Sequence, residues 1–302
     1  MPGQRTDMPA KIIQGRDLSE QIRQRNESRV RELADKGVTV RLDAIIVGEP
    51  ESGIIYARSQ ERKCQSIGID YRLHTLPGNA NDNELQALID NLNSDPNVTG
   101  ILLNLPLPNH LDAPAAQYAI DPYKDIEGVN PSNIGLMFYG TPINAPCTAL
   151  AVHTILNEAK VELRGKNITV VGQGNIVGKP IALALIAEEA TVDTCNKYTD
   201  NLMAHTKGAD ILIAAAGVPE MITADHVKEG AIVIDVGINS VPADEAKGTP
   251  ARVVGDVLFD EVSQKASLIT PVPGGVGPVT VAVLLQSAID AANKQLGTRR
   301  FR

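Results

Sequence analysis

The stretch VVGQGNIVGKP, residues 170–180, decides the fold of this chain. Its β-branched start has the pattern of a buried strand, three glycines follow, and a helix is predicted beyond them. Glycines let the backbone approach a pyrophosphate, which then lies on the free N–H groups of the helix N-terminus. The spacing G-x-G-x-x-x-G is one residue longer than the common dinucleotide fingerprint, so a tight structural turn is the alternative.

Buried strands follow this turn at regular intervals. A second strand ends in the stretch TVDTCNKYT, residues 191–199, about 20 residues beyond the glycines, and residues 209–217 and 231–239 are two further buried apolar runs. A strand, a glycine-rich turn, a helix and a second strand form the unit that binds dinucleotides. The sequence therefore predicts a Rossmann-type dinucleotide-binding domain.

The upstream half of the chain shows the same alternation. Residues 41–48 (RLDAIIVG), 70–77 and 98–108 have strand patterns, the last stopped by prolines. Between them, residues 54–68 and 82–96 have apolar positions spaced as on one face of a helix. Strands that alternate with helices indicate a parallel sheet.

The fold class predicted is α/β with two domains. We expect an N-terminal α/β substrate domain with a parallel sheet over residues 8–150, completed by a C-terminal helix over 279–297. The Rossmann domain should cover 151–278, and the expected site is a cleft between the two domains. Met8 is a candidate start, which would make residues 1–7 an extension.

Composition excludes several functional classes. The formal net charge is −8, aromatic residues make up 3% and there is no Trp, which argues against nucleic acid as a partner. No apolar run approaches about 18 residues and the N-terminus lacks an apolar signal segment, so no membrane partner is expected. Cys64, Cys147 and Cys195 are far apart and the five histidines are scattered, which predicts no disulfide framework and no metal site. A reducing cytoplasmic location fits this usage.

Two residues bear on the choice between NADP and NAD. Asp193 is near the position where an acidic residue would bind the ribose 2′-hydroxyl of NAD, but it alternates with Thr191 and Cys195 inside the strand. Lys197 follows the strand and is well placed to pair with a 2′-phosphate. We therefore favour NADP, with NAD as the alternative; a solvated lysine is the other interpretation of Lys197.

Five motifs, taken together and in order, resemble the methylenetetrahydrofolate dehydrogenase/cyclohydrolase family, the bifunctional FolD enzymes, from about Lys11 to Lys294. They are LNLPLP (103–108), KDIEG (124–128), GNIVGKP (174–180), VIDVGIN (233–239) and TPVPGGVGPVT (270–280). The resemblance implies interconversion of 5,10-methylene-, 5,10-methenyl- and 10-formyl-tetrahydrofolate, with NADP as cofactor, in a cytoplasmic homodimer. It places the protein in folate one-carbon metabolism, which serves purine and amino-acid biosynthesis.

The resemblance also assigns individual residues. Tyr56 matches the tyrosine of the family's Tyr-x-x-x-Lys motif, which stacks on folate, but Gln60 stands at the lysine position. Asn104 replaces the family's glutamine, Glu127 replaces the aspartate that holds the pterin amino and N3 donors, and Ala149 replaces the proline of Pro-Cys-Thr-Pro.

Gln60 is the change with the greatest chemical effect. An amide carries neither a proton nor a positive charge, so it cannot replace lysine in the cyclohydrolase step. Hydride transfer depends mainly on orientation, so dehydrogenase activity is expected to persist. Lys63, seven residues after Tyr56, is one alternative proton carrier, although a solvated lysine is the favoured interpretation. A catalytically silent folate- or nucleotide-binding paralogue is the second hypothesis.

The candidate catalytic residues are Tyr56, Gln60, Asn104 and Glu127. The candidate substrate-binding residues are Tyr56, Glu127, Pro273, Gly274 and Gly275. The candidate cofactor-binding residues are Gly172, Gln173, Gly174, Asn175, Ile176, Lys197 and Ile238.

Overall fold

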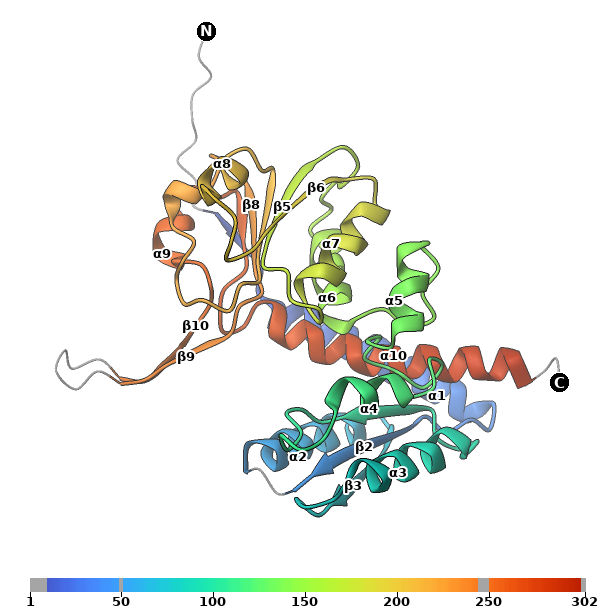
Figure 1. The fold of residues 1–302 in the computed structure, drawn as a ribbon. Helices are drawn as coiled ribbons and strands as arrows, with labels where there is room; N and C mark the ends of the chain where they lie inside the picture. Colours follow the sequence, from blue (N-terminus) through green and yellow to red (C-terminus); the bar gives the residue numbers. More distant parts are fainter. Residues whose placement is uncertain (1–9, 49–50, 244–249, 300–302) are drawn as a thin grey trace, which may run out of the picture. The chain divides into compact units, whose positions relative to one another are not determined.

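A computed structural model describes residues 10–48, 51–243 and 250–299. Met8 and residues 1–7 therefore lie outside the described residues. The chain forms two compact units, each assembled from separate parts of the sequence (Figure 1). The first unit contains the chain up to Ser19 together with Thr148–Thr280, and the second contains Glu20–Cys147 together with the chain from Val281 onward.

The first unit is built on a six-stranded sheet in which every pair of neighbouring strands is parallel. The order across the sheet is β1 (Lys11–Ile12), β11 (Leu268–Ile269), β8 (Ile232–Asp235), β7 (Ile211–Ala214), β5 (Asn167–Val171) and β6 (Thr191–Cys195). This order makes β6 an edge strand, next to the strand that leads into the glycine turn.

Helices and a hairpin complete the first unit. Its helical segments are α6 (Cys147–Glu158), α7 (Gly178–Ala187), α8 (Leu202–Thr206), η1 (Ala224–His226) and α9 (Phe259–Val262). Helices α6 and α7 lie on one side of the sheet and α9 on the other, while the antiparallel hairpin of β9 (Asn239–Val241) and β10 (Arg252–Val254) extends away from it (Figure 1). The sheet is thus covered on both faces, as a parallel sheet requires.

The second unit contains a three-stranded parallel sheet in the order β3 (Asp70–Leu76), β2 (Arg41–Val47) and β4 (Gly100–Leu103). Its helices are α1 (Gly15–Asp35, from Glu20), α2 (Glu51–Gln65), α3 (Asp82–Ser94), α4 (Ala113–Ala119), α5 (Pro131–Phe138) and α10 (Val276–Arg299, from Val281). The central strand β2 is buried along its whole length, since it has neighbours on both edges and both faces are covered.

Local sequence explains where one of these helices begins. Helix α3 begins with a capping box, in which the Asn81 side chain accepts from the Glu84 N–H and the Glu84 carboxylate accepts from the Asn81 N–H. The reciprocal bonds satisfy N–H groups that a helix start otherwise leaves free. Its apolar face, Leu85, Ile89 and Leu92, packs into the core of this unit.

Helix α10 packs on helix α1 within the second unit. The buried Asn26 amide donates to the Ala282 carbonyl at 3.1 Å, and Arg29 pairs with Asp290. The segment Val276–Gly297 is also the one described helix that is long and apolar enough to cross a membrane by length and composition. Since 61% of that window is buried within the protein, its apolar character is that of a core helix.

The predicted two-domain α/β fold with parallel sheets is confirmed. The start of the first domain differs, because the prediction assigned residues from 8 onward to the substrate domain. In the structure, β1 pairs in parallel with β11 and so belongs to the sheet of the other unit. A two-residue strand gives too short a pattern to reveal its partner, which is set by main-chain hydrogen bonds.

Candidate functional site

The glycine turn follows strand β5 and leads into helix α7. The Val177 N-cap makes no side-chain hydrogen bond to the first turn of α7, so no side-chain cap occupies this helix start. The Lys179 N–H of this turn donates to the Gly174 carbonyl at 3.1 Å, and the helix dipole favours an anion at this end of α7.

Each of the three glycines has a different physical role. Gly172 has φ +121°, and a Cβ there would lie 2.0 Å from the Ala215 carbonyl oxygen. A Cβ on Gly178 would lie 1.8 Å from the Gly172 carbonyl oxygen, so the turn and α7 pack too closely for any side chain. Gly174 differs because its Cβ would have nothing within 4 Å, which leaves open space over the turn for a ligand. In dinucleotide-binding folds the three glycines have these same roles: one allows the tight turn, one lets the pyrophosphate approach the backbone, and one allows close packing of the helix.

The polar side chains of the turn are tied to strand β6 and to α7. The Gln173 amide donates to the carbonyl and hydroxyl oxygens of Thr194, and Asn196 donates back to Gln173 at 2.8 Å. Lys179 donates to the Asn175 side chain at 2.7 Å. These bonds fix the turn in place before any ligand binds.

Past the end of β6, Lys197 is exposed, and its ammonium lies 4.9 Å from the centre of the Tyr198 ring. No carboxylate neutralises it among the described ion pairs, so its charge is available to an anionic ligand. Asp193, by contrast, is paired with His205 at 2.6 Å. Its position inside the strand, rather than at the tip, agrees with the alternation seen in the sequence.

A second group of predicted residues lines one cavity of about 240 Å³ in the same unit. Ile238 lies there with the Pro273–Gly275 segment. The cavity also contains Arg16 and the buried Asp235. Burial raises the pKa of Asp235 to about 7, although the carboxylate accepts main-chain N–H bonds from Gly237, Asp256 and Val257.

In the second unit, Tyr56 and Gln60 lie one turn apart on α2. Tyr56 is 49% exposed, whereas Gln60 is 3% exposed. Among the described residues, neither polar atom of the Gln60 amide has a hydrogen-bond partner of normal geometry. A buried amide left without partners is costly, by roughly 1–3 kcal/mol for a group of this kind, and points to a ligand that would supply them.

Glu127 lies close enough to Tyr56 for its charge to matter. Burial first, and then the charge of Glu127, raise the pKa of the Tyr56 hydroxyl, while the nearby Gln60 amide lowers it. Burial and the charge of Asp125 raise the pKa of Glu127 itself from 4.5 to about 8, against the effect of the Leu103 main-chain N–H. The carboxyl group is therefore mainly neutral at pH 7 in the free protein.

Asn104 follows β4 at the carboxyl edge of the sheet. It is 8% exposed, and its side-chain amide donates to the Ile45 carbonyl at 3.1 Å. One of its two amide N–H groups is thus used inside the protein, which leaves the other N–H and the side-chain oxygen for any further contact. The structure brings Tyr56, Gln60 and Glu127 together, and joins Asn104 to them through the adjacent Leu103.

The segment that carries Glu127 is held by the buried Asp125. The Asp125 carboxylate accepts from the N–H groups of Gly128 and Asn130 and from the Asn133 amide. Burial raises the pKa of Asp125. Its role is structural, because it joins the loop residues Gly128 and Asn130 to Asn133 in the first turn of α5.

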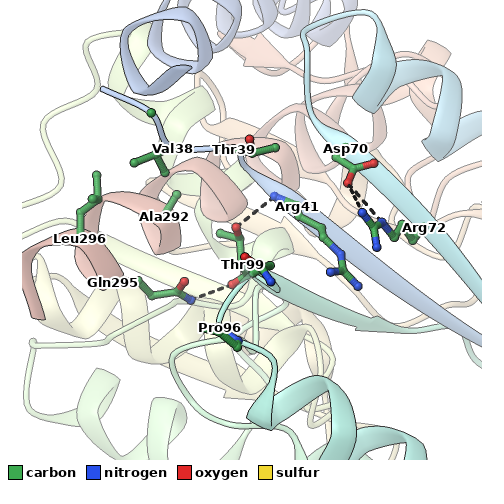
Figure 2. A pocket seen from close by; sticks show the side chains of 12 residues that line it. Val38, Thr39, Arg41, Asp70, Arg72, Pro96, Thr99, Ala292, Gln295 and Leu296 are labelled. Atoms are coloured by element: carbon green, nitrogen blue, oxygen red, sulfur yellow. Dashed lines mark hydrogen bonds and ion pairs between the residues drawn. The ribbon is translucent and has the colours of Figure 1, made fainter. Parts of the chain in front are cut away.

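Another cavity, of about 400 Å³, lies at the amino ends of strands β2, β3 and β4. Figure 2 shows Arg41 on its wall, where the Arg41 main-chain N–H donates to the Thr99 hydroxyl. The Arg41 guanidinium pairs with Asp43 and Asp95, so its charge is compensated within the protein. None of the predicted site residues lines this cavity, which is at the opposite edge of the sheet from Asn104.

Comparisons with known proteins agree with this geometry. Residues 13–127 match the tetrahydrofolate dehydrogenase/cyclohydrolase catalytic domain, and residues 146–296 match the NAD(P)-binding domain of the same family. The chain belongs to the tetrahydrofolate dehydrogenase/cyclohydrolase family.

Individual members of this family are similar over nearly their whole length. The bifunctional protein FolD of Pelobacter propionicus is 45% identical over 285 residues, 94% of this chain and 98% of the relative. The crystal structure of the bifunctional FolD of Campylobacter jejuni has a TM-score of 0.90 and 39% identity, covering 94% of this chain and 99% of that one. The FolD of Trypanosoma brucei, solved with NADP and an inhibitor, has a TM-score of 0.88 and 35% identity, covering 96% and 99%.

Family membership does not by itself reveal the residues that sequence reasoning missed. Arg16 and Asp235 line the cavity of the Pro273–Gly275 segment, yet neither has a pattern that marks it. Cys147 is buried, and its thiol contacts the Ile126 carbonyl at 3.4 Å, next to Glu127 in the chain. The Pro-Cys-Thr sequence at residues 146–148 is the signal that could have marked Cys147.

The different roles of Gly174 and Gly178 predict opposite effects of substitution. Gly174→Ala should change the free energy of unfolding by less than about 1 kcal/mol, yet weaken dinucleotide binding by about tenfold or more. Gly178→Ala should destabilise the protein by about 1–3 kcal/mol, since the methyl group collides with the Gly172 carbonyl. Urea unfolding and calorimetric titration with NADP measure the two effects, and equal effects at both positions would refute the assignment.

The raised pKa of Glu127 predicts a stability that depends on pH. The folded state holds the Glu127 proton more tightly than the unfolded state does. The resulting contribution to the free energy of unfolding is present below pH 4.5 and is lost as pH rises through 8. The variant Glu127→Gln should therefore gain stability relative to the parent between pH 6 and pH 9, because it lacks this titration.

Urea unfolding of both proteins across this pH range is the measurement. The pKa of Asp235 is also raised, so its titration changes the stability of both proteins alike. The result is therefore taken from the difference in free energy of unfolding between parent and variant. A constant difference from acid to alkaline pH would contradict a raised pKa at Glu127.

Proposed function

We propose that this protein is an NADP-dependent 5,10-methylenetetrahydrofolate dehydrogenase of folate one-carbon metabolism, in which the family's 5,10-methenyltetrahydrofolate cyclohydrolase activity is weakened. The observation that carries the proposal is the buried Gln60 amide beside Tyr56, whose nitrogen and oxygen have no hydrogen bond of normal geometry among the described residues. This is a site prepared to bind a polar ligand. The Gln60 amide neither gains nor loses a proton near neutral pH, and it carries no positive charge.

The residues of the second unit support binding and orientation of the folate. The exposed ring of Tyr56 offers a flat surface for stacking against the substrate. Glu127 offers two oxygens to the paired donors of a pterin edge, provided that it gives up the proton that its raised pKa retains. Gln60 offers one donor group and one acceptor in the same region.

The glycine turn supports binding of the cofactor. Open space over Gly174, the free start of α7 and the charge of Lys197 fit a dinucleotide that carries phosphate. The glycine turn and Lys197 would hold NADP, which would supply the acceptor for a hydride from the substrate's methylene carbon. The protein has to orient the two partners and exclude water, and this step requires no protonated side chain.

The cyclohydrolase step makes different demands. Water must add to the methenyl carbon and a C–N bond must break, so protons have to move in both stages. Loss of a positioned general acid–base group typically costs about 10²–10⁴-fold in rate. Lys63 is exposed to solvent, whereas Gln60 is buried, so the two side chains have different environments on α2.

A catalytically silent binding protein is the less favoured function. The relatives with similar sequences are bifunctional FolD proteins, and the glycine turn keeps all three of its roles. We also propose a homodimer and a cytoplasmic location, by analogy with the family. Three free, buried cysteines fit a reducing compartment.

The first experiment separates the two activities. Purified protein should form NADPH from methylenetetrahydrofolate at a readily measured rate, while methenyltetrahydrofolate should disappear close to its spontaneous rate. The double variant Gln60→Lys with Asn104→Gln should gain more hydrolase activity than the two single variants combined, since neighbouring residues couple by about 0.5–3 kcal/mol. Gln65→Lys, which adds a lysine at an exposed position of α2, is the matched control.

Two results would count against parts of this proposal. If the parent hydrolyses methenyltetrahydrofolate as fast as it forms it, then another group carries the proton and the role of Gln60 is wrong. If no NADPH forms although NADP and folate both bind, the silent-binding alternative is correct.

The second experiment concerns cofactor choice. NADP should have a higher kcat/KM than NAD, and Lys197→Ala should reduce this preference by about 1–2 kcal/mol, which is the range of a hydrogen bond to a charged group. Lys207→Ala, at an exposed position after α8, should leave the preference unchanged. Equal use of both cofactors by the parent protein would exclude a 2′-phosphate contact at Lys197.

A further inference from the structure

Three potential metal ligands meet on the edge strand of the first unit. Asp193 and Cys195 are two residues apart on β6, so their side chains point to the same face of the sheet. His205 comes from helix α8, and its Nδ1 atom lies 2.6 Å from an Asp193 carboxylate oxygen. The carboxylate oxygen, the thiol sulfur and the imidazole nitrogen all lie within 4.8 Å of one another.

From this arrangement we propose that Asp193, Cys195 and His205 bind a divalent transition-metal ion, with Zn²⁺ as the ion of best fit. The spacing of cysteines and histidines in the sequence predicted no such site. The fold creates it by bringing α8 against β6. This inference is independent of the proposed folate chemistry.

The donor set selects the class of metal. Thiolate, imidazole and carboxylate together are ligands of Zn²⁺, whereas Mg²⁺ and Ca²⁺ prefer oxygen alone. Bonds of about 2.0 Å to nitrogen and oxygen and about 2.3 Å to sulfur place tetrahedral ligand atoms roughly 3.3–3.5 Å apart. No separation here exceeds 4.8 Å, and the contact of 2.6 Å between Asp193 and His205 has to lengthen by roughly 0.7 Å.

The side chains have the freedom that this adjustment needs. Asp193 and His205 have side chains that are 48% and 38% exposed, and Cys195 is buried beneath them. Metal binding would replace the thiol proton, which passes to solvent. Three protein ligands on an open surface leave the fourth position to water.

The surroundings hold His205 in place. The Thr169 hydroxyl on β5 donates to the His205 main-chain carbonyl at 2.9 Å and so fixes the end of α8 to the sheet. Thr194 lies between Asp193 and Cys195 on β6, so its side chain points to the opposite face of the sheet. Its hydroxyl and its main-chain carbonyl accept hydrogen bonds from the Gln173 amide. A bound metal would therefore brace the strand whose other side supports the glycine turn.

A simple surface ion pair is the competing explanation, and the chain contains a natural comparison for it. His153 and Glu188 form a similar pair in the same unit, at 2.8 Å, with both side chains partly exposed. None of the three described cysteines takes part in a ligand cluster with that pair. Only the first pair therefore has the thiol that gives selectivity for zinc.

The test uses the full-length protein without an affinity tag, stripped with a chelator and kept reduced by a phosphine. Dialysis against Zn²⁺ should give one bound ion per chain, and Co²⁺ should give an absorption band of thiolate-to-metal charge transfer. His205→Gln and Asp193→Asn should each weaken zinc binding by tenfold or more, since even indirect partners of a metal site contribute about 10–100-fold. Cys195→Ser should abolish the cobalt band, while His153→Gln should behave as the parent.

The proposal is overturned if zinc binding persists at full strength in both His205→Gln and Cys195→Ser, or if the cobalt complex shows no thiolate band. Far-ultraviolet circular dichroism of each stripped variant separates loss of a ligand from loss of folding. Because Asp193 and His205 are partly exposed, Asp193→Asn and His205→Gln are the variants expected to fold like the parent, and they decide the result should Cys195→Ser be unfolded.

Discussion

Parallel strand pairing is the constraint on which both parts of the site depend. Within the six-stranded sheet and the three-stranded sheet all strands run in one direction, so the carboxyl ends of each sheet's strands meet along a single edge. Asn104 follows β4 in this way, and the glycine turn follows β5. The Ala215 carbonyl, just past β7, meets the turn at the same edge and prevents a side chain at Gly172. The direction of the strands thus places the candidate site residues at one edge of each sheet, whatever their side chains.

Much of this could be predicted from the sequence, because periodicity and glycine spacing report on local structure. The turn at 170–180 has the three separate roles that its motif indicated, and the α/β alternation located most of the strands. Other features depend on contacts between distant residues. The partner of β1 and the burial of the Gln60 side chain are of this kind, and no local pattern encodes them.

Strand β6 shows how one residue can have a different role from the one its position suggests. The sequence offered Asp193 as a ribose ligand, with its alternation in the strand as the argument against. In the structure the carboxylate is engaged by His205, a residue that a scattered distribution of histidines gave no reason to select. Distance along the chain concealed a cluster that the pairing of β6 with β5 and the packing of α8 create.

The discontinuous assembly of each unit has a consequence for synthesis on the ribosome. Residues 20–147 emerge early, but Asn26 and Arg29 acquire their partners on α10 only after about 250 further residues have been translated. Until then, the face of α1 that α10 covers stays exposed, and the nascent chain carries an incomplete core that is open to chaperones. Strand β1 likewise waits for β11. Neither unit can therefore finish folding before its partner residues near 270 or 290 have been translated, and a frameshift just before them would damage the part of the protein that was made first.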